Sequence, residues 1–353
     1  MSLKTYAEAI NEALHFALQS DDNVICYGLG VTDPKAVFGT TVGLENKFGK
    51  DRVFDMPTSE NAMTGVAIGA SLNKIKPIVT HQRLDFFLLA MDQLVNSAAK
   101  YYYMYGSKIN VPITIRLIIG RGWGQGPTHS QNLQAWFSHI PGLKVVMPTT
   151  PQDAKSTLIN SIFDPNPVIF LEHRWLHQVK GDVSEKNQVE NLKGSKLIRK
   201  GSDITIISMS YMTLEALKAS DYLLKNFNIS SEVIDLILIK PIDWDEIFLS
   251  IEKTGRVLVV DTGFTTGSVA GEIIANIVTK KFNFLKSAPS RLAMPDVPEP
   301  TSFGLTRGFY IGAKDIVMET LNQLKENYNK LSLEELDEPE LHDVPGEWFK
   351  GPF

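Results

Sequence analysis

One carboxylate stands at the start of an unusual run of small residues. Glu60 opens the stretch ENAMTGVAIGAS, in which apolar and small side chains recur at helical spacing. The pattern predicts a helix that begins near Ser59 and holds the carboxylate at its positively polarised N-terminal end. Gly65 and Gly69 weaken such a helix, which indicates that another backbone packs closely against it. Taken alone, Glu60 could simply complement the helix dipole.

A histidine is the second candidate for chemistry. His129 follows the loop GRGWGQG at 120–126, which we call the glycine loop. A loop with this many glycines is expected where the backbone must come close to a ligand. Its imidazole can change charge near neutral pH, so it could bind substrate or take part in catalysis. A single histidine is more often a structural residue, and this is the role we expect for His139 in the SHIPG turn.

Three blocks of the sequence resemble one family. They are FDMPTSENAMTGVAIGASLNKIKPIVTHQRLDF at 54–86, MDQLVNSAAKYYYMYG at 91–106 and THSQNLQAWFSHIPGLKVVMPTTPQDAK at 128–155. From Tyr6 to about Asn327 the chain resembles the β subunits (E1β) of thiamine-diphosphate-dependent 2-oxo acid dehydrogenases, in the transketolase-like superfamily. The resemblance implies a pyrimidine-binding domain followed by a transketolase C-terminal domain.

The resemblance also implies roles for individual residues. Glu60 would hydrogen-bond N1′ of the cofactor's aminopyrimidine, and this role requires a buried carboxylate with an elevated pKa. Phe86 would lie beside the pyrimidine ring, although it could also be a core residue of its FFLL run. His129 would lie in the active site, and Leu29 stands near the cofactor where most of the family has a glutamate.

The sequence lacks the motif that would bind the diphosphate half of the cofactor. Related enzymes hold the diphosphate through Mg²⁺ bound by a GDG sequence, but Gly181 and Asp182 are followed here by Val183. The resemblance therefore implies that an E1α-type subunit holds Mg²⁺ and the diphosphate, in an α₂β₂ heterotetramer with the cofactor at the α/β interface. A lipoyl acyltransferase (E2) is the further partner that this family would use.

A monovalent cation site is also implied by the resemblance. The matching segment is SIFDPNPVIF, where Asp164 and Asn166 would bind K⁺ together with the carbonyl groups of Ser161, Ile162 and Ile113. The sequence D-P-N-P is turn chemistry in its own right, so a plain loop is the alternative.

The pocket residues depart from the family. Pyruvate-type chains read EFMTFNF where this chain reads THQRLDF, which introduces His81 and Arg83, and Arg121 lies in the glycine loop. These three residues predict a more cationic pocket and an anionic or phosphorylated substrate, because arginine binds carboxylate and phosphate groups bidentately. Each arginine could instead be a solvated surface residue, and Arg83 could pair with Asp85.

The elements that must position these residues alternate between strand and helix, which predicts mainly parallel sheets covered by helices. We expect a pyrimidine-binding domain at 1–180, a linker at 181–201, a C-terminal domain at 202–330 and an extended tail at 331–353. In the first domain, strands are expected at 24–30, 52–55, 77–81 and 112–119 and in the runs GLKVVMP and NPVIFLE, and helices at 5–19, 41–48, 84–105 and 151–163. In the second, strands are expected in DITIISM, SEVIDLI, RVLVVD and SRLAM, and helices at 213–226, 243–253, 268–280 and 313–328.

Composition excludes several classes of protein. The 353 residues are 43% hydrophobic and 21% charged, with a net charge of −5 and no basic block, so nucleic acid is not an expected partner. No apolar run reaches the length of a membrane span. The single cysteine, Cys26, lies in an apolar run and suits a buried thiol in a cytoplasmic protein.

Three functions are compatible with these observations. The first is an E1β subunit of an enzyme that decarboxylates a 2-oxo acid and passes the acyl group to a lipoyl group. The second is one subunit of a split transketolase, which transfers a two-carbon ketol unit to an aldehyde. The third is a non-catalytic subunit that only supports a partner.

Overall fold

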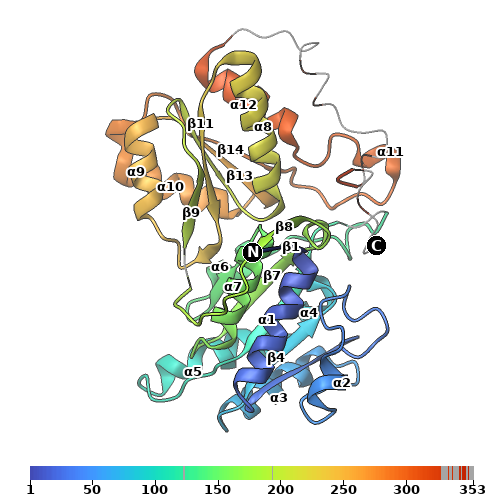
Figure 1. Cartoon of the computed structure of the whole chain (residues 1–353). Coiled ribbons are helices and arrows are strands. Elements are labelled where there is room, and N and C mark those ends of the chain that lie inside the picture. The colour runs from blue at the N-terminus through green and yellow to red at the C-terminus, as the bar shows by residue number, and fades with distance from the viewer. Residues whose placement is uncertain are drawn as a thin grey trace.

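The computed structural model consists of two α/β domains that lie one above the other (Figure 1). It describes residues 1–121, 124–192 and 194–326, and from the rest of the chain 333, 336, 342, 344–346 and 349. Within this part of the chain, no helix is both long enough and apolar enough to cross a membrane.

The first domain is built on a mainly parallel sheet. Among the described residues its strand order is β12-β6-β7-β5-β4-β2-β3, and all neighbouring pairs except β12 with β6 are parallel. Because the central strands are buried on both faces, they read as continuous apolar runs. The strands are β2 (Val24–Gly28), β3 (Val53–Asp55), β4 (Lys76–His81), β5 (Thr114–Ile119), β6 (Lys144–Val146), β7 (Val168–His173) and β12 (Leu238–Lys240).

Helices cover both faces of this sheet. On one face, α1 (Tyr6–Ser20) packs against α7 (Pro151–Ile162), and on the other α3 (Glu60–Ser71) packs beside β4. Thr5 and Glu8 form a capping box that fixes the start of α1, as the sequence pattern of Thr5 three residues before Glu8 favours. The short helices α2 (Leu44–Phe48) and α6 (Gln134–His139) complete the domain.

The expected helix at 84–105 is helical but not uniform. It consists of α4 (Leu84–Phe87), a 3₁₀ turn at Leu88–Ala90, a π-helical segment at Gln93–Ala98 and α5 (Ala99–Met104). Its start and middle bury apolar side chains, whereas Tyr103 at its end is 86% exposed. The last turn of this segment therefore lies at the surface.

The second domain repeats the α/β plan on a smaller sheet. The described strands run in the order β14-β13-β10-β11-β9, and only β9 is antiparallel to its neighbour. The strands are β9 (Ser195–Arg199), β10 (Ile204–Ser208), β11 (Ser231–Leu236), β13 (Val257–Phe264) and β14 (Ser290–Met294). The helices are α8 (Tyr211–Phe227), α9 (Asp245–Thr254), α10 (Val269–Lys281), α11 (Phe303–Thr306) and α12 (Ala313–Leu324).

The expected linker at 181–201 is ordered at both ends. Its first residues belong to β8 (Lys180–Val183), which pairs with β1 (Ser2–Thr5), and its last ones form β9 on the second sheet. In addition, β12 comes from the sequence of the second domain but joins the first sheet next to β6. The two domains are therefore tied together by strand pairing as well as by the connecting chain.

Most of the expected tail at 331–353 lies outside the described residues, so its extended shape stays a prediction. The tail residues that the structure describes include Leu333, Leu336, His342 and Phe349, and all four are buried. Phe349 lies against Trp175 of the first domain, with ring centroids 6.3 Å apart.

Candidate active site

The candidate site lies at one edge of the first sheet. Parallel strands bring their carboxyl ends to the same edge, and in α/β proteins this is where ligands bind. Leu29 follows β2, His81 ends β4, Arg121 follows β5 and Arg174 follows β7. Leu29 is partly buried and donates its N–H to the carbonyl oxygen of Thr80 at 3.2 Å, so it lies beside the end of β4.

Glu60 begins helix α3, as the sequence predicts. Glu60 is only 6% exposed although it lies in the first turn of the helix. The hydroxyl of the preceding residue, Ser59, makes no capping hydrogen bond. Thr64 donates its hydroxyl to the carbonyl oxygen of Glu60 at 3.0 Å, which fixes the first turn of the helix. The site therefore has a nearly buried carboxylate at a helix N-terminus.

The two glycines of α3 are not covered by another backbone segment in the described part of this chain. A Cβ at Gly65 would meet the Gln93 side chain at 3.5 Å, an ordinary contact, and a Cβ at Gly69 would meet no described atom within 4 Å. The expectation of a close backbone neighbour is thus unmet within the described part of this chain. The exposed side chain of Val66 lies on the same helix.

Phe86 and His129 lie together. Their rings are perpendicular, with centroids 5.2 Å apart and an interplanar angle of 89°. Phe86 is 42% exposed, so it is not the core residue that the FFLL run allowed; the neighbouring Phe87 is fully buried instead. The hydroxyl of Thr128 lies 2.9 Å from Nδ1 of His129 and orients the imidazole.

Two glycines of the glycine loop lie close to protein groups, whereas a Cβ at Gly124 would meet no described atom within 4 Å. A Cβ at Gly120 would lie 2.4 Å from Nε2 of His173, and a Cβ at Gly126 would lie 2.1 Å from Oγ1 of Thr301. Both glycines have positive φ angles. Because Thr301 belongs to the second domain, the loop before His129 is fixed by both domains.

Arg83 is held by the glycine loop and not by Asp85. Its Nη1 donates to Oε1 of Gln125 at 2.7 Å and to the carbonyl oxygen of His129 at 3.3 Å. Asp85 instead accepts a hydrogen bond from the side-chain amide of Gln131 at 2.8 Å. Partial burial lowers the pKa of Arg83, and the charge of Asp85 opposes this change.

Two site residues were missed by the sequence analysis. Arg174, 49 residues after Gln125, donates its Nη1 to the same Oε1 that Arg83 contacts. Glu299, on the loop after β14, is 1% exposed, and neither of its carboxylate oxygens has a hydrogen-bond partner among the described residues. Burial and the charge of Asp85 raise the pKa of Glu299 to about 7. No sequence pattern around Arg174 or Glu299 indicates a role in the site, because only the folded chain brings these residues to it.

His81 does not contribute the positive charge that was expected of it. Its ring is buried against Phe87, with centroids 5.0 Å apart, and desolvation lowers its pKa to about 4. The imidazole is therefore neutral at pH 7, and the expectation of a cationic His81 is wrong. Both ring nitrogens are buried without a hydrogen-bond partner in the described structure. A substrate contact of His81 stays a prediction.

Arg121 is engaged by aromatic rings and the tail. Its guanidinium lies 3.5 Å from the ring centroid of Tyr310 and 4.4 Å from that of Trp175, and Nη2 donates to the carbonyl oxygen of His342 at 3.0 Å. The side chain is therefore not the solvated arginine of the alternative interpretation. Its role toward substrate stays a prediction.

Several of the groups expected to bind K⁺ already have partners, whereas Oδ1 of Asn166 is buried without a hydrogen-bond partner among the described residues. Asp164 forms an ion pair with Lys144 and accepts the N–H of Asn166 at 2.9 Å. The carbonyl oxygen of Ser161 accepts the hydroxyl of Thr114 at 3.0 Å, and that of Ile113 accepts the N–H of Val168 at 3.0 Å. The ammonium group of Lys144 is thus paired with the Asp164 carboxylate that would bind a cation. A K⁺ site at these residues stays a prediction.

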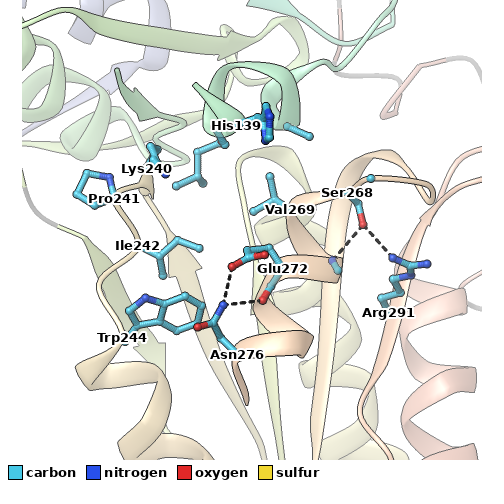
Figure 2. A pocket seen from close by; sticks show the side chains of 15 residues that line it. His139, Lys240, Pro241, Ile242, Trp244, Ser268, Val269, Glu272, Asn276 and Arg291 are labelled. Atoms are coloured by element: carbon cyan, nitrogen blue, oxygen red, sulfur yellow. Dashed lines mark hydrogen bonds between the residues drawn. The ribbon is translucent and has the colours of Figure 1, made fainter. Parts of the chain in front are cut away.

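A groove of about 590 Å³ lies elsewhere, between the domains (Figure 2). His139 and its neighbours on α6 form one wall, and α10 and β14 form another. The hydroxyl of Ser268 accepts hydrogen bonds from Arg291 at 3.4 Å and from the N–H of Gly271 at 3.2 Å. None of the residues predicted for the site lines this groove.

Two family models match the chain in succession. The transketolase pyrimidine-binding domain matches residues 3–179, and the transketolase C-terminal domain matches residues 194–316. A solved structure described as a split-gene transketolase, an inactive β4 tetramer, has the same fold, with a TM-score of 0.73. It is 20% identical and covers 92% of this chain and 99% of its own. The class is therefore a two-domain α/β protein of the transketolase type.

Curated relatives define the family more closely. The chain is 37% identical to a pyruvate dehydrogenase E1 subunit β-1 of Arabidopsis thaliana, over 89% of this chain and 87% of that one. It is 36% identical to the corresponding E1 subunit β of Bacillus subtilis, over 92% and 100%, and 38% identical to an acetoin:2,6-dichlorophenolindophenol oxidoreductase subunit β of Cupriavidus necator, over 83% and 89%. The chain belongs to this family of E1β subunits, whose enzymes depend on thiamine diphosphate.

Proposed function

We propose that the chain is the E1β subunit of a dehydrogenase that decarboxylates a 2-oxo acid and transfers the acyl group to a lipoyl group. One observation carries the proposal. A nearly buried carboxylate, Glu60, begins a helix that packs against the segment carrying Phe86, whose half-exposed ring touches His129. This set of groups suits an aromatic, nitrogen-containing ring that approaches from outside the chain.

The residues present fit one half of thiamine diphosphate. Glu60 offers a carboxylate for a ring nitrogen, and Phe86 offers an aromatic face. Among the described residues no group of three His, Cys, Asp or Glu side chains could hold a metal ion. This division supports a partner of the E1α type that holds Mg²⁺ and the diphosphate, in an α₂β₂ assembly.

The roles of the residues follow from their chemistry. When bound, thiamine diphosphate supplies a carbanion that attacks the carbonyl carbon of the substrate. Glu60 would accept or donate a hydrogen bond at the nitrogen of the aminopyrimidine ring. His129, oriented by Thr128, would donate a hydrogen bond or a proton to the substrate. Arg83 would bind an anionic group of the substrate.

Transfer of a ketol unit is the second candidate. It needs the same cofactor and the same half-site, and the arginine side chains near His129 suit a phosphorylated ketose as well as an acid. The test is to produce the chain together with its E1α-type partner and measure turnover of 2-oxo acids, with a lipoyl acceptor, and of ketoses, with an aldehyde acceptor. Lipoyl-dependent turnover of a 2-oxo acid supports the proposal, and turnover of ketoses alone contradicts it.

A further inference from the structure

Two arginine side chains from different parts of the chain meet at one neutral oxygen. Arg83, just after β4, and Arg174, at the end of β7, both donate an Nη1 hydrogen bond to Oε1 of Gln125. Arg174 is 1% exposed, and its Nε has no hydrogen-bond partner among the described residues. One amide oxygen thus serves two guanidinium groups, so their hydrogen-bonding capacity is left largely unused.

The charges of this pair are not balanced within the described chain. Burial and the charge of Arg83 together lower the pKa of Arg174 to about 9, and the charge of Asp85 opposes this change. The nearby carboxyl groups are those of Asp85, which binds Gln131, and Glu299, which burial keeps largely protonated up to about pH 7. No described carboxylate forms an ion pair with either arginine.

Another buried arginine shows how this fold balances such a charge. Arg116 is fully buried in the first sheet and forms a bidentate ion pair with Glu172, at 2.7 and 3.0 Å. A buried guanidinium without an anion is costly, and arginine pairs recognise carboxylate and phosphate groups well. The contrast indicates that no residue in the described part of the chain supplies the anion for Arg174.

We infer that Arg83 and Arg174 form a binding site for an anionic group that the substrate keeps throughout the reaction, a carboxylate or a phosphate. The inference rests on the proposed function, because the pair reaches the site through the Arg83 contact with the backbone of His129. Gln125 is the residue that holds the two guanidinium groups together when the anion is not bound.

The anion is not the carboxylate that leaves as carbon dioxide. Decarboxylation converts that carboxylate into a neutral product, so two guanidinium groups bound to it would stabilise the substrate more than the transition state. The same contacts to a group that stays charged would strengthen binding without opposing the reaction. The substrate class is therefore a 2-oxo acid or ketose with a second, distal anion.

The test uses the enzyme assembled with its E1α-type partner. Arg174→Met and Gln125→Glu are compared with a control, Arg199→Met, which removes a partly exposed arginine that pairs with Asp221 in the second domain. Gln125→Glu places a carboxylate between the two guanidinium groups and so mimics the bound anion. It should fold even if Arg174→Met does not, because it supplies the missing countercharge.

Two readouts are measured on each variant. Turnover is followed with 2-oxobutyrate, which has no distal anion, with 2-oxoglutarate, which has a distal carboxylate, and with fructose 6-phosphate, which has a phosphate. Binding of inorganic phosphate to the assembled enzyme is measured by calorimetry, which does not depend on turnover. If the wild-type enzyme turns over none of the three substrates, the proposed function is in question, while phosphate binding still tests the anion site.

The expected result is selective. Both variants lose phosphate binding, and Arg174→Met raises KM at least about tenfold for whichever substrate with a distal anion the enzyme accepts, the size expected for a lost charged hydrogen bond. Which of the two anionic substrates is affected identifies the anion as carboxylate or phosphate. The inference is overturned if KM rises equally for 2-oxobutyrate, or if phosphate binds both variants as tightly as it binds the control.

Discussion

Glu299 brings a carboxyl group from the second domain to the edge of the first sheet. Its loop touches the glycine loop through Thr301 and Gly126, and its carboxylate oxygens have no hydrogen-bond partner within the described structure. Burial, together with the charge of Asp85, raises its pKa from 4.5 to about 7. A carboxyl group in this state is protonated at mildly acidic pH and becomes costly when it ionises.

This shift predicts a pH-dependent stability. Between about pH 4.5 and 7 the folded chain holds a proton on Glu299 that the unfolded chain has lost, so the free energy of unfolding falls as the pH rises. Glu299→Gln should therefore stabilise the chain by roughly 1–3 kcal/mol more at pH 8 than at pH 5. Thermal unfolding of both proteins at the two pH values measures the difference.

The control for this prediction is Glu319→Gln on the partly buried face of α12, which should change stability equally at both pH values. An effect of Glu299→Gln that is the same at pH 5 and pH 8 would show that the carboxyl group is not protonated in the folded chain.

At the scale of single residues, sequence reasoning found groups whose roles are local. Glu60 was found because the small-residue run follows it, and Phe86 and His129 were found through motifs that lie close to them in the chain. Arg174 and Glu299 were missed because each acts on residues 40 or more positions away, where no spacing rule applies. The charge state of His81 was also not predictable, since it depends on the burial of its ring against Phe87.

Helix α3 is the element that the site depends on most, and one of its faces has no neighbour in the described chain. Gly69 is exposed, with no described atom within 4 Å of the position that a Cβ would take. Alanine is a better helix former than glycine, so no contact in the described part of this chain explains the glycine. A second chain that packs closely against α3 would explain it.

We therefore predict that Gly69→Ala has opposite effects on the stability of the chain and on its assembly with a partner. The isolated chain should become more stable by about 1 kcal/mol, because alanine loses less backbone entropy in a helix. Association with a partner chain should weaken, because the added methyl group would occupy the contact. Chemical unfolding of the chain alone and analytical ultracentrifugation of the mixture give the two quantities. Unchanged association would remove the argument for a neighbour at this face.

The elements themselves were largely predictable, because their signals are local. The capping box of Thr5 and Glu8 marks the start of α1, and the apolar runs mark the buried parallel strands. Pairing between distant segments was not predictable. The strand β12 joins the first sheet from the sequence of the second domain, and β9 belongs to the stretch that was expected to be a linker. Both strands are short, and their pairing depends on strands β6 and β11, which are distant in the sequence.

At the scale of the whole molecule, the proposed function divides the cofactor site between this chain and a partner. The described residues provide a carboxylate and an aromatic face but no group of acidic or histidine side chains for a metal ion. We predict that the chain alone binds thiamine diphosphate weakly, because the diphosphate and Mg²⁺ would supply most of the affinity. Calorimetry with and without the E1α-type partner measures this. Tight, Mg²⁺-dependent binding by the isolated chain would contradict a divided site.

The central claim is that Glu60 acts on the cofactor, and one substitution tests it directly. Glu60→Gln keeps the shape of the side chain but cannot exchange a proton, whereas Glu45→Gln makes the same change in the first turn of α2, away from the site. In the assembled enzyme, Glu60→Gln should reduce kcat more than about tenfold, a barrier change above about 1.4 kcal/mol, without lowering the melting temperature. Glu45→Gln should leave kcat unchanged. If Glu60→Gln retains more than about a tenth of wild-type turnover, the account is wrong.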